Sequence, residues 1–95
     1  MVSLQLLRYT VFYTYIIYSE KLNKYYVGHT EDISLRLERH NTGWSRFTSQ
    51  AQDWVLKHFE QFPTKSEAIK RENSIKRMKS RKYIEELIVA GGRPD

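Results

Sequence analysis

The sequence predicts an α+β domain: a small three-stranded sheet that contains a β-hairpin, flanked by about three helices in the order β-β-α-β-α-α. Two runs rich in β-branched and aromatic residues lie close together early in the chain, and a third follows in the middle. Helix-capping residues precede the remaining stretches. A chain of 95 residues has room for one domain. We expect residues 9–90 to form it, between an N-terminal extension (1–8) and a C-terminal tail (91–95).

Residue type and a turn predict the strands. Residues 9–18 and 25–28 are rich in Tyr, Val, Ile and Thr, and the polar residues 19–24 separate them, which is typical of a β-hairpin. Residues 53–60 form the third predicted strand. The pattern leaves the order of the strands in the sheet open.

Capping residues and glycines predict the helices. The predicted caps are Thr30, Thr64 and Ser80. The corresponding helices are predicted over residues 30–40, 65–79 and 80–90, the last of them ending at a Gly-Gly pair. Between the first helix and the third strand, residues 42–52 are expected to form a loop.

The charge of the chain favours a polyanionic partner. Sixteen Lys and Arg against eleven Asp and Glu give a net charge of +5. Residues 64–82 alone contain eight basic and two acidic residues, which favours a phosphate-binding surface over a merely basic domain. The predicted nucleic-acid-binding residues are Lys65, Lys70, Arg71, Lys76, Arg77, Lys79, Arg81 and Lys82.

Several classes of protein and site are disfavoured. The chain has no cysteine, which removes disulfides and thiolate zinc sites. No apolar run approaches the length of a membrane span, and residues 1–8 are too short for a signal peptide. We therefore expect a soluble, cytoplasmic protein that does not contact membranes. Neither a paired-histidine zinc motif nor a phosphate-binding glycine loop occurs.

Glu72 interrupts the apolar stripe of the second predicted helix. Ala68, Ile69, Ile75 and Met78 recur at helical spacing, and Glu72 fills the gap between Ile69 and Ile75. A carboxylate in such a place is costly unless it is paired or binds a metal. A salt bridge, or a position at the edge of the stripe, is the alternative to a functional role.

Arg36 and His40 are four residues apart and flank the apolar face that Ile33 and Leu37 mark. An arginine can bind phosphate oxygens with two parallel hydrogen bonds, and a histidine can transfer a proton near neutral pH. Taken alone, the pair fits better an exposed arginine and a partly buried histidine with satisfied hydrogen bonds than a functional site.

Aromatic residues gather in the predicted hairpin and in the loop. Six of the seven tyrosines fall within residues 9–26, where packing explains most of them but a phenol-lined site is also compatible. Gly28 interrupts the second strand, as happens where a backbone bends or is approached closely. Trp44 and Phe47 are interpreted as loop anchors packed on the core, with stacking on a nucleic-acid base as the alternative.

The order of these residues resembles that of the GIY-YIG nuclease superfamily, in particular its short bacterial members that consist of the nuclease domain alone. The resemblance covers about residues 9–88. The matching motifs are Tyr13-Thr14-Tyr15, Tyr26-Val27-Gly28, Arg36-Leu37-Glu38-Arg39-His40-Asn41 and Ser66-Glu67-Ala68-Ile69-Lys70-Arg71-Glu72. The first motif departs from the family pattern, since only its terminal tyrosine is retained.

The resemblance implies a metal-dependent endonuclease that hydrolyses phosphodiester bonds. Glu72 would hold one Mg²⁺ or Mn²⁺ ion, and Arg36 would neutralise the phosphate oxygens. Tyr15 would act as the base with Tyr26 as its partner, provided that nearby cations lower the phenol pKa. The implied catalytic residues are Tyr15, Tyr26, Arg36, His40 and Glu72, with Gly28 as part of the motif backbone. The role of His29, where several relatives carry lysine, stays open.

The implied substrate is nucleic acid, and we expect it to be DNA. We expect the protein to have little sequence specificity, and selectivity for branched or frayed DNA is an option. A non-catalytic nucleic-acid-binding module or an adaptor with a protein partner, built on the same fold, is the alternative. The sequence leaves open the natural substrate, DNA versus RNA, and the oligomeric state.

Overall fold

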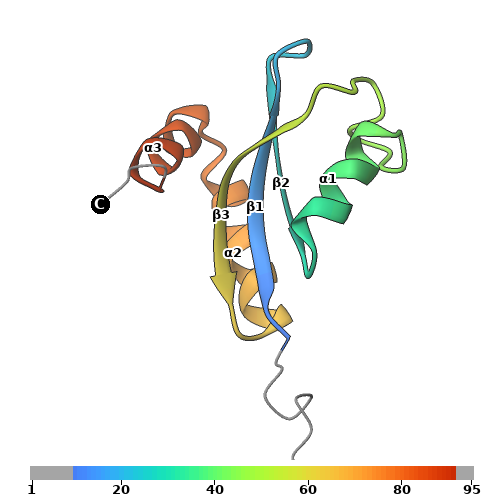
Figure 1. Ribbon diagram of the computed structural model, residues 1–95. Helices are drawn as coiled ribbons and strands as arrows, with labels where there is room; N and C mark the ends of the chain where they lie inside the picture. Colours follow the sequence, from blue (N-terminus) through green and yellow to red (C-terminus); the bar gives the residue numbers. More distant parts are fainter. Residues whose placement is uncertain (1–9, 92–95) are drawn as a thin grey trace, which may run out of the picture.

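The structure, a computed structural model, describes residues 10–91 of the chain (Figure 1). This part contains β1 (Phe12–Ser19), β2 (Lys24–Thr30), α1 (Ile33–Asn41), β3 (Val55–Phe62), α2 (Lys65–Met78) and α3 (Arg81–Gly91). The predicted α+β class and the order β-β-α-β-α-α are confirmed. The predicted N-terminal extension, residues 1–8, and residues 92–95 of the predicted tail lie outside the described residues.

The three strands form one antiparallel sheet in the order β2-β1-β3, so the first strand lies at its centre. Tyr15 pairs with Gly28 on one side and with Phe59 on the other. An irregularity between Ile16 and Ile17 shifts the pairing with β3 by one residue. Because β2 is an edge strand, side chains from the two faces of the sheet can approach each other around its outer edge.

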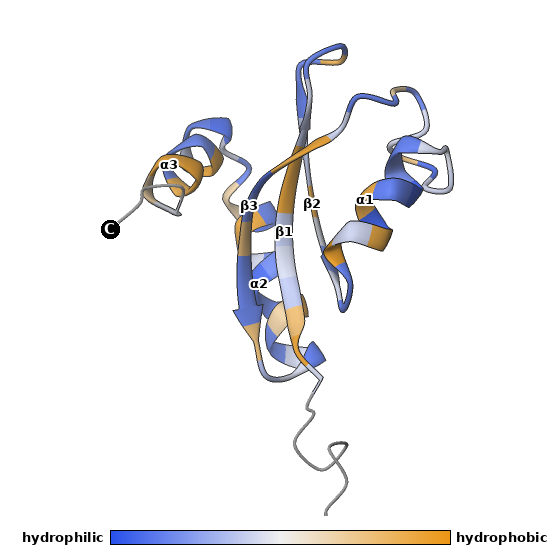
Figure 2. Ribbon diagram, viewed as in Figure 1, coloured by the Kyte–Doolittle hydropathy of each residue, from blue (hydrophilic) through white to orange (hydrophobic). Residues whose placement is uncertain are grey.

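The helices lie on opposite faces of the sheet (Figure 1). On one face, Tyr15 and Ile17 of β1 pack with Trp54 of the loop, and α1 contributes to the same cluster. On the other face, Ile16 packs with Ile75 of α2, and α3 contributes further apolar side chains. The alternation along β1 follows from the two-residue period of a strand. Hydrophobic residues colour parts of β1 and of α3, and α1 shows both hydrophobic and hydrophilic residues (Figure 2).

The beginning of α1 differs from the prediction. Asp32, not Thr30, caps the helix, because its carboxylate accepts a hydrogen bond from the Leu35 amide at 3.0 Å. Thr30 is the last residue of β2 and pairs with Tyr13. The second strand therefore continues two residues beyond the predicted segment.

The caps of the later helices agree with the prediction. Thr64 accepts a hydrogen bond from the Glu67 amide at 3.2 Å, and Ser80 accepts one from the Tyr83 amide at 3.0 Å. α2 ends at Lys79, whose φ of 48° places it in the left-handed region. Within the part of the chain that the structure describes, no helix is long and apolar enough to cross a membrane.

The third strand begins at Val55, two residues later than predicted. Asp53 instead ties the loop to the hairpin, because its carboxylate accepts hydrogen bonds from the Ser19 hydroxyl at 2.6 Å and the Lys21 amide at 2.9 Å. Trp54 is buried, and Asn41 holds its backbone at both the amide and the carbonyl. These side-chain bonds replace the ladder bonds that a strand would have formed here.

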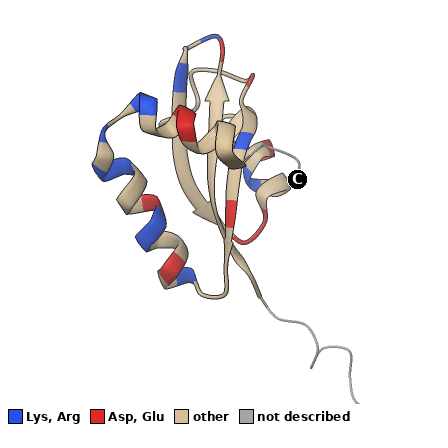
Figure 3. Cartoon of the chain, turned by 90° about the vertical axis from the view of Figure 1, so that its left-hand side faces the viewer, with Lys and Arg blue, Asp and Glu red and all other residues tan. Residues whose placement is uncertain are grey.

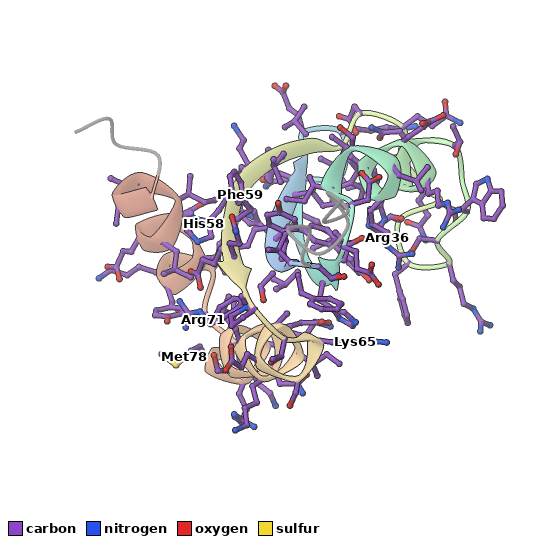
Figure 4. The ribbon with its side chains drawn as sticks, turned by 60° about the horizontal axis from the view of Figure 1, so that its bottom comes forward. Arg36, His58, Phe59, Lys65, Arg71 and Met78 are labelled. Atoms are coloured by element: carbon purple, nitrogen blue, oxygen red, sulfur yellow. The ribbon has the colours of Figure 1, made fainter. Side chains whose placement is uncertain are left out.

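Three expectations about apolar side chains are wrong. Trp44 and Phe47 are 73% and 79% exposed, so neither anchors the loop on the core. Trp54 is the aromatic residue that anchors the loop. Met78 is 54% exposed and lies at the end of α2, outside the apolar stripe (Figure 4). The stripe itself is confirmed in Ala68 and Ile75, which are buried.

An ion-pair cluster joins α2 to β3 on the face of the sheet that carries α3. The Arg71 guanidinium donates to both carboxylate oxygens of Glu60, at 2.7 and 3.1 Å, and to the Tyr83 hydroxyl at 3.2 Å. His58 contacts the same carboxylate at 2.8 Å. Arg71 and His58 lower the pKa of Glu60 in spite of its partial burial. This bidentate pair fixes α2 on the sheet.

We expect Arg71→Gln to destabilise the fold by about 1–3 kcal/mol, because it leaves a partly buried carboxylate without its main partner. Lys70→Gln, on the same helix, is the control and should change the free energy of unfolding by less than about 0.5 kcal/mol. Urea denaturation of the two variants and wild type measures this difference. Equal stability of the two variants would contradict a structural role for Arg71.

Candidate active site

Tyr15 is the centre of the candidate site. It lies on the middle strand and is 2% exposed. Its phenol ring extends over Gly28 of the neighbouring strand, where a Cβ atom on residue 28 would lie 2.6 Å from the Tyr15 hydroxyl and 2.8 Å from Cζ. Gly28 is therefore required for space, and the group that approaches it closely is the tyrosine side chain itself.

Two side chains of α1 meet the Tyr15 hydroxyl. His40 Nε2 lies 2.7 Å from the hydroxyl oxygen, and Arg36 Nε donates to the same oxygen at 3.4 Å. The two residues reach one atom because they are one helical turn apart. Arg36 and His40 therefore point to the same side of α1, and His40 is fully buried.

Tyr26 completes an aromatic group around His40. The two rings are 4.9 Å apart between centroids, and Tyr26 lies 6.4 Å from Tyr15 by the same measure. Tyr26 is only partly buried, so its ring borders the solvent side of the site. Of the five predicted catalytic residues, the structure brings Tyr15, Tyr26, Arg36 and His40 into one cluster.

Glu72 approaches this cluster from the opposite face of the sheet. One carboxylate oxygen lies 2.6 Å from His29 Nδ1 on the edge strand, and the other lies 2.5 Å from Lys76 Nζ. The same Lys76 Nζ lies 5.9 Å from the centroid of the Tyr26 ring. Lys76 therefore connects Glu72 to the tyrosine cluster around the free edge of β2.

Burial and charge set the protonation of the two groups in contact. Burial raises the pKa of Tyr15 to about 12, although the Arg36 guanidinium acts in the opposite direction. Burial and the neighbouring Arg36 charge lower the pKa of His40 to about 4. At neutral pH the site thus holds a phenol and a neutral imidazole. Burial outweighs the lowering effect of Arg36, so the described side chains produce no net lowering of the Tyr15 pKa, contrary to the expectation.

The donor set suits one hard divalent ion of the kind that the sequence resemblance implies. Mg²⁺ and Mn²⁺ accept a single carboxylate together with water and phosphate oxygens. Glu72 supplies such a carboxylate at the rim of the site, with 11% of its side chain exposed. Its partners His29 and Lys76 are 32% and 48% exposed, so each can turn into solvent and release an oxygen. Among residues 10–91 no group of three or more His, Cys, Asp or Glu side chains gathers to form a metal cluster.

Two hollows flank the site. One, of about 390 Å³, is lined by His29 and Arg36 and also by Lys65 at the start of α2. Figure 4 shows Arg36 and Lys65 on facing sides of the space between α1 and α2. The other hollow, of about 470 Å³, is lined by Tyr26 and Lys76 together with cationic and aromatic side chains of the hairpin and the loop. Each hollow therefore carries cationic side chains beside the site.

The predicted basic residues fall into different environments along α2, in the turn after it and at the start of α3 (Figure 3). Lys65 lines the first hollow and Lys76 the second. Lys70 and Arg77 line a separate surface groove with Arg71. Arg81 donates to Glu85 and to Asn23, and stacks on Tyr25 at 5.1 Å. For each of the eight residues, including Lys79 and Lys82, contact with nucleic acid stays a prediction.

Comparison with known proteins agrees with these observations. The family model of the GIY-YIG catalytic domain matches residues 11–84. The chain belongs to the GIY-YIG family. The predicted resemblance is thereby confirmed for the family, and a nuclease is the activity that this domain implies.

Individual relatives match the chain over most of their own length. A UPF0213 protein of Staphylococcus haemolyticus is 38% identical over 78 residues, which cover 78% of this chain and 94% of that protein. A UPF0213 protein of Halobacterium salinarum is 40% identical over 55 residues, covering 57% of this chain and 71% of the other. The solution structure of a UPF0213 protein from Bacillus halodurans matches with a TM-score of 0.56 and 29% identity, over 88% of each chain.

Three features of the site escape sequence reasoning. Thr48 lies in the loop, where no periodicity marks it, yet its hydroxyl contacts His40 Nδ1 at 2.7 Å. The sequence prediction assigns Lys76 to phosphate binding alone, although its i,i+4 spacing to Glu72 is a signal for an ion pair. The same prediction leaves the role of His29 open, although the alternation of β2 could have placed it on the face that α2 covers.

We expect Gly28→Ala to displace the Tyr15 ring, because the added methyl group would overlap the hydroxyl. Overpacking of this kind costs about 1–3 kcal/mol. Urea denaturation measures the loss, and NMR of the Tyr15 and His40 side chains reports whether their hydrogen bond persists. Unchanged stability together with unchanged Tyr15 and His40 resonances would contradict this account of Gly28.

We expect the fold to lose stability as the pH falls from about 6.5 to about 4. His40 binds a proton less readily in the folded protein than in the unfolded chain, so protonation in this window favours unfolding. A shift from 6.5 to about 4 corresponds to roughly 3 kcal/mol. Denaturation of wild type and His40→Gln at several pH values tests this, and equally steep pH dependence in both proteins would contradict it.

Proposed function

We propose that this GIY-YIG protein is an endonuclease that hydrolyses phosphodiester bonds in nucleic acid, with DNA as the expected substrate and one Mg²⁺ or Mn²⁺ ion as cofactor. One observation carries the proposal. The Tyr15 hydroxyl is held between His40 Nε2 at 2.7 Å and Arg36 Nε at 3.4 Å, at the sheet edge that Glu72 approaches. A neutral proton acceptor can take a proton from the attacking water, a cation can balance the charge of the phosphate, and a carboxylate can hold a divalent ion.

Tyr15 would pass a proton from the attacking water to His40. With a phenol pKa of about 12, Tyr15 is not ionised at neutral pH and cannot act as a standing base. It can give its own proton to His40 Nε2 while its oxygen takes the proton of the water. The water oxygen then forms the new bond to phosphorus, and the bond from phosphorus to the leaving oxygen breaks. The products are a phosphate monoester and a hydroxyl group, the latter protonated from solvent.

Arg36 and Glu72 would handle the charge of the phosphate. The Arg36 guanidinium lines the first hollow and can donate to non-bridging oxygens as their charge grows. Glu72 would hold the divalent ion after His29 or Lys76 releases one of its oxygens. A bound Mg²⁺ or Mn²⁺ ion supplies Lewis-acid stabilisation of phosphate oxygens. Tyr26, packed against His40, would act as the partner that positions the water.

The surroundings favour contacts with phosphates over contacts with base edges. Lys65 and Arg39 line the first hollow, and Lys24, Arg46 and Lys76 line the second. Such contacts fix the position of a strand and carry no sequence information, so little sequence specificity is expected. Phe47 borders the second hollow and is 79% exposed, which offers a stacking surface to a base at a branched or frayed position.

We expect Glu72→Gln to lower cleavage by at least about 100-fold, because the substitution removes the charge that would hold the ion while keeping the shape of the side chain. The measurement incubates the protein with single-stranded, duplex and branched DNA and with RNA, in the presence of Mn²⁺ or Mg²⁺. Glu67→Gln, an exposed carboxylate of the same helix, is the matched control and should cleave like wild type.

The outcomes separate the alternatives. Cleavage that Glu72→Gln leaves unchanged would contradict the assignment of Glu72. Binding of nucleic acid by wild type without cleavage of any substrate would favour a non-catalytic binding module on the same basic surface. Retention of a protein partner at high salt, with no binding of nucleic acid at low salt, would favour an adaptor.

A further inference from the structure

A buried chain of hydrogen bonds continues from Tyr15 into the loop after α1. His40 Nδ1 lies 2.7 Å from the Thr48 hydroxyl oxygen, and that hydroxyl lies 3.5 Å from the Ser45 carbonyl oxygen. Tyr15, His40 and Thr48 are 2%, 0% and 0% exposed, so before substrate and the attacking water enter the site their hydrogen-bond partners are the neighbouring protein groups. The chain therefore has few ways to arrange its protons.

The Thr48 end of the chain is consistent with one arrangement, with a long contact of 3.5 Å to the Ser45 carbonyl. A carbonyl oxygen only accepts hydrogen bonds, so the Thr48 hydroxyl donates to Ser45. Its oxygen is then left to accept from His40 Nδ1, which must carry a proton. A neutral imidazole has one N–H group, so His40 Nε2 carries none and accepts from the Tyr15 hydroxyl.

The Tyr15 end of the chain selects the same arrangement independently. Arg36 Nε can only donate, and it donates to the Tyr15 oxygen. The Tyr15 hydroxyl proton thus needs an acceptor elsewhere, and His40 Nε2 at 2.7 Å is the acceptor that the described contacts provide. If His40 donated from Nε2 instead, the buried Tyr15 proton would have no partner.

The loop holds Thr48 firmly in place. The Thr48 carbonyl accepts hydrogen bonds from the buried Trp54 indole at 2.9 Å and from the Ala51 amide at 3.3 Å. The Asn41 side chain in turn forms hydrogen bonds with both the backbone amide and the backbone carbonyl of Trp54. The exposed aromatic residues of the loop lie outside this network, so the position of Thr48 does not depend on them.

We propose that Thr48 is a positioning residue, which holds His40 in the tautomer with the proton on Nδ1 and so keeps Nε2 free to accept the proton of Tyr15. This inference rests on the proposed function for its catalytic meaning. Thr48 itself touches neither the phosphate nor the water. Its contribution is to set the direction of the proton transfer before the substrate arrives.

The tautomer of His40 is measurable by nitrogen-15 NMR at neutral pH, without any substrate. Wild type should show a protonated Nδ1 and an unprotonated Nε2. In Thr48→Val, which replaces the hydroxyl with a methyl group, the population should move towards protonated Nε2. Thr48→Ser restores the hydroxyl and should restore the wild-type pattern. Thr42→Val, which removes a hydroxyl that bonds Glu38 and Arg39 carbonyls, is the control and should leave His40 unchanged.

Cleavage provides the second measurement. We expect Thr48→Val to lower the rate about 10- to 100-fold without weakening the binding of nucleic acid, and Thr48→Ser to cleave nearly like wild type. Urea denaturation of each variant shows whether it is folded, and Thr48→Ala provides a second variant without the hydroxyl if the valine does not fit.

The results distinguish this inference from the proposed function. A protonated Nε2 in wild type, or the same His40 tautomer in wild type, Thr48→Val and Thr48→Ala, would overturn the role of Thr48 whether or not the protein cuts nucleic acid. The predicted change of tautomer in a protein that cleaves nothing would support the positioning role while contradicting the proposed nuclease.

Discussion

The candidate site depends on a buried phenol whose hydroxyl group must be satisfied. Tyr15 lies on the central strand, so its ring can enter neither solvent nor the opposite face of the sheet. Gly28 makes room for it, and α1 supplies the partners His40 and Arg36. The space that the Tyr15 ring occupies therefore requires a glycine at position 28 of the neighbouring strand. The hydrogen bonds of its hydroxyl group determine which side of α1 faces the sheet.

The edge position of β2 explains how groups from both faces of the sheet form one site. Tyr15 and His40 belong to the face that α1 covers, whereas Glu72 lies on α2 across the sheet. They approach each other only because no further strand continues beyond β2 in the described sheet. Lys76, in contact with Glu72 and near Tyr26, spans that edge. Residues of β2 line both hollows, His29 the first and Tyr26 the second.

Binding of a metal ion by Glu72 requires that at least one of its two ion pairs opens. Both carboxylate oxygens are engaged, by His29 and Lys76, so an arriving cation competes with two existing partners. Glu72 itself is buried, whereas His29 and Lys76 are 32% and 48% exposed, so either partner can turn into water while the carboxylate stays in place. An arriving divalent ion would then replace the charge of the partner that leaves, which keeps the buried carboxylate neutralised.

The parts of the molecule that local chemistry determines can be predicted from the sequence. The six elements follow from residue type and capping, and Glu72, Arg36 and His40 were recognised because each sits beside an apolar stripe at helical spacing. The limits appear where contacts are non-local. The position of Thr48 against His40, the ion pair of Arg71 with Glu60, and the burial of Trp54 in preference to Trp44 depend on how the loop and α2 pack. Strand order and the cap of α1 likewise depend on pairing between Thr30 and Tyr13, which no local pattern encodes.

The most direct measurement is a crystal structure of the protein with Mn²⁺ and a short DNA strand, in which anomalous scattering locates the ion. The account predicts an ion bound by Glu72, with a phosphate between it and the Tyr15 and Arg36 side chains, and with Lys76 or His29 turned away from the carboxylate. An ion bound elsewhere, with Glu72 still paired to both His29 and Lys76, would contradict it.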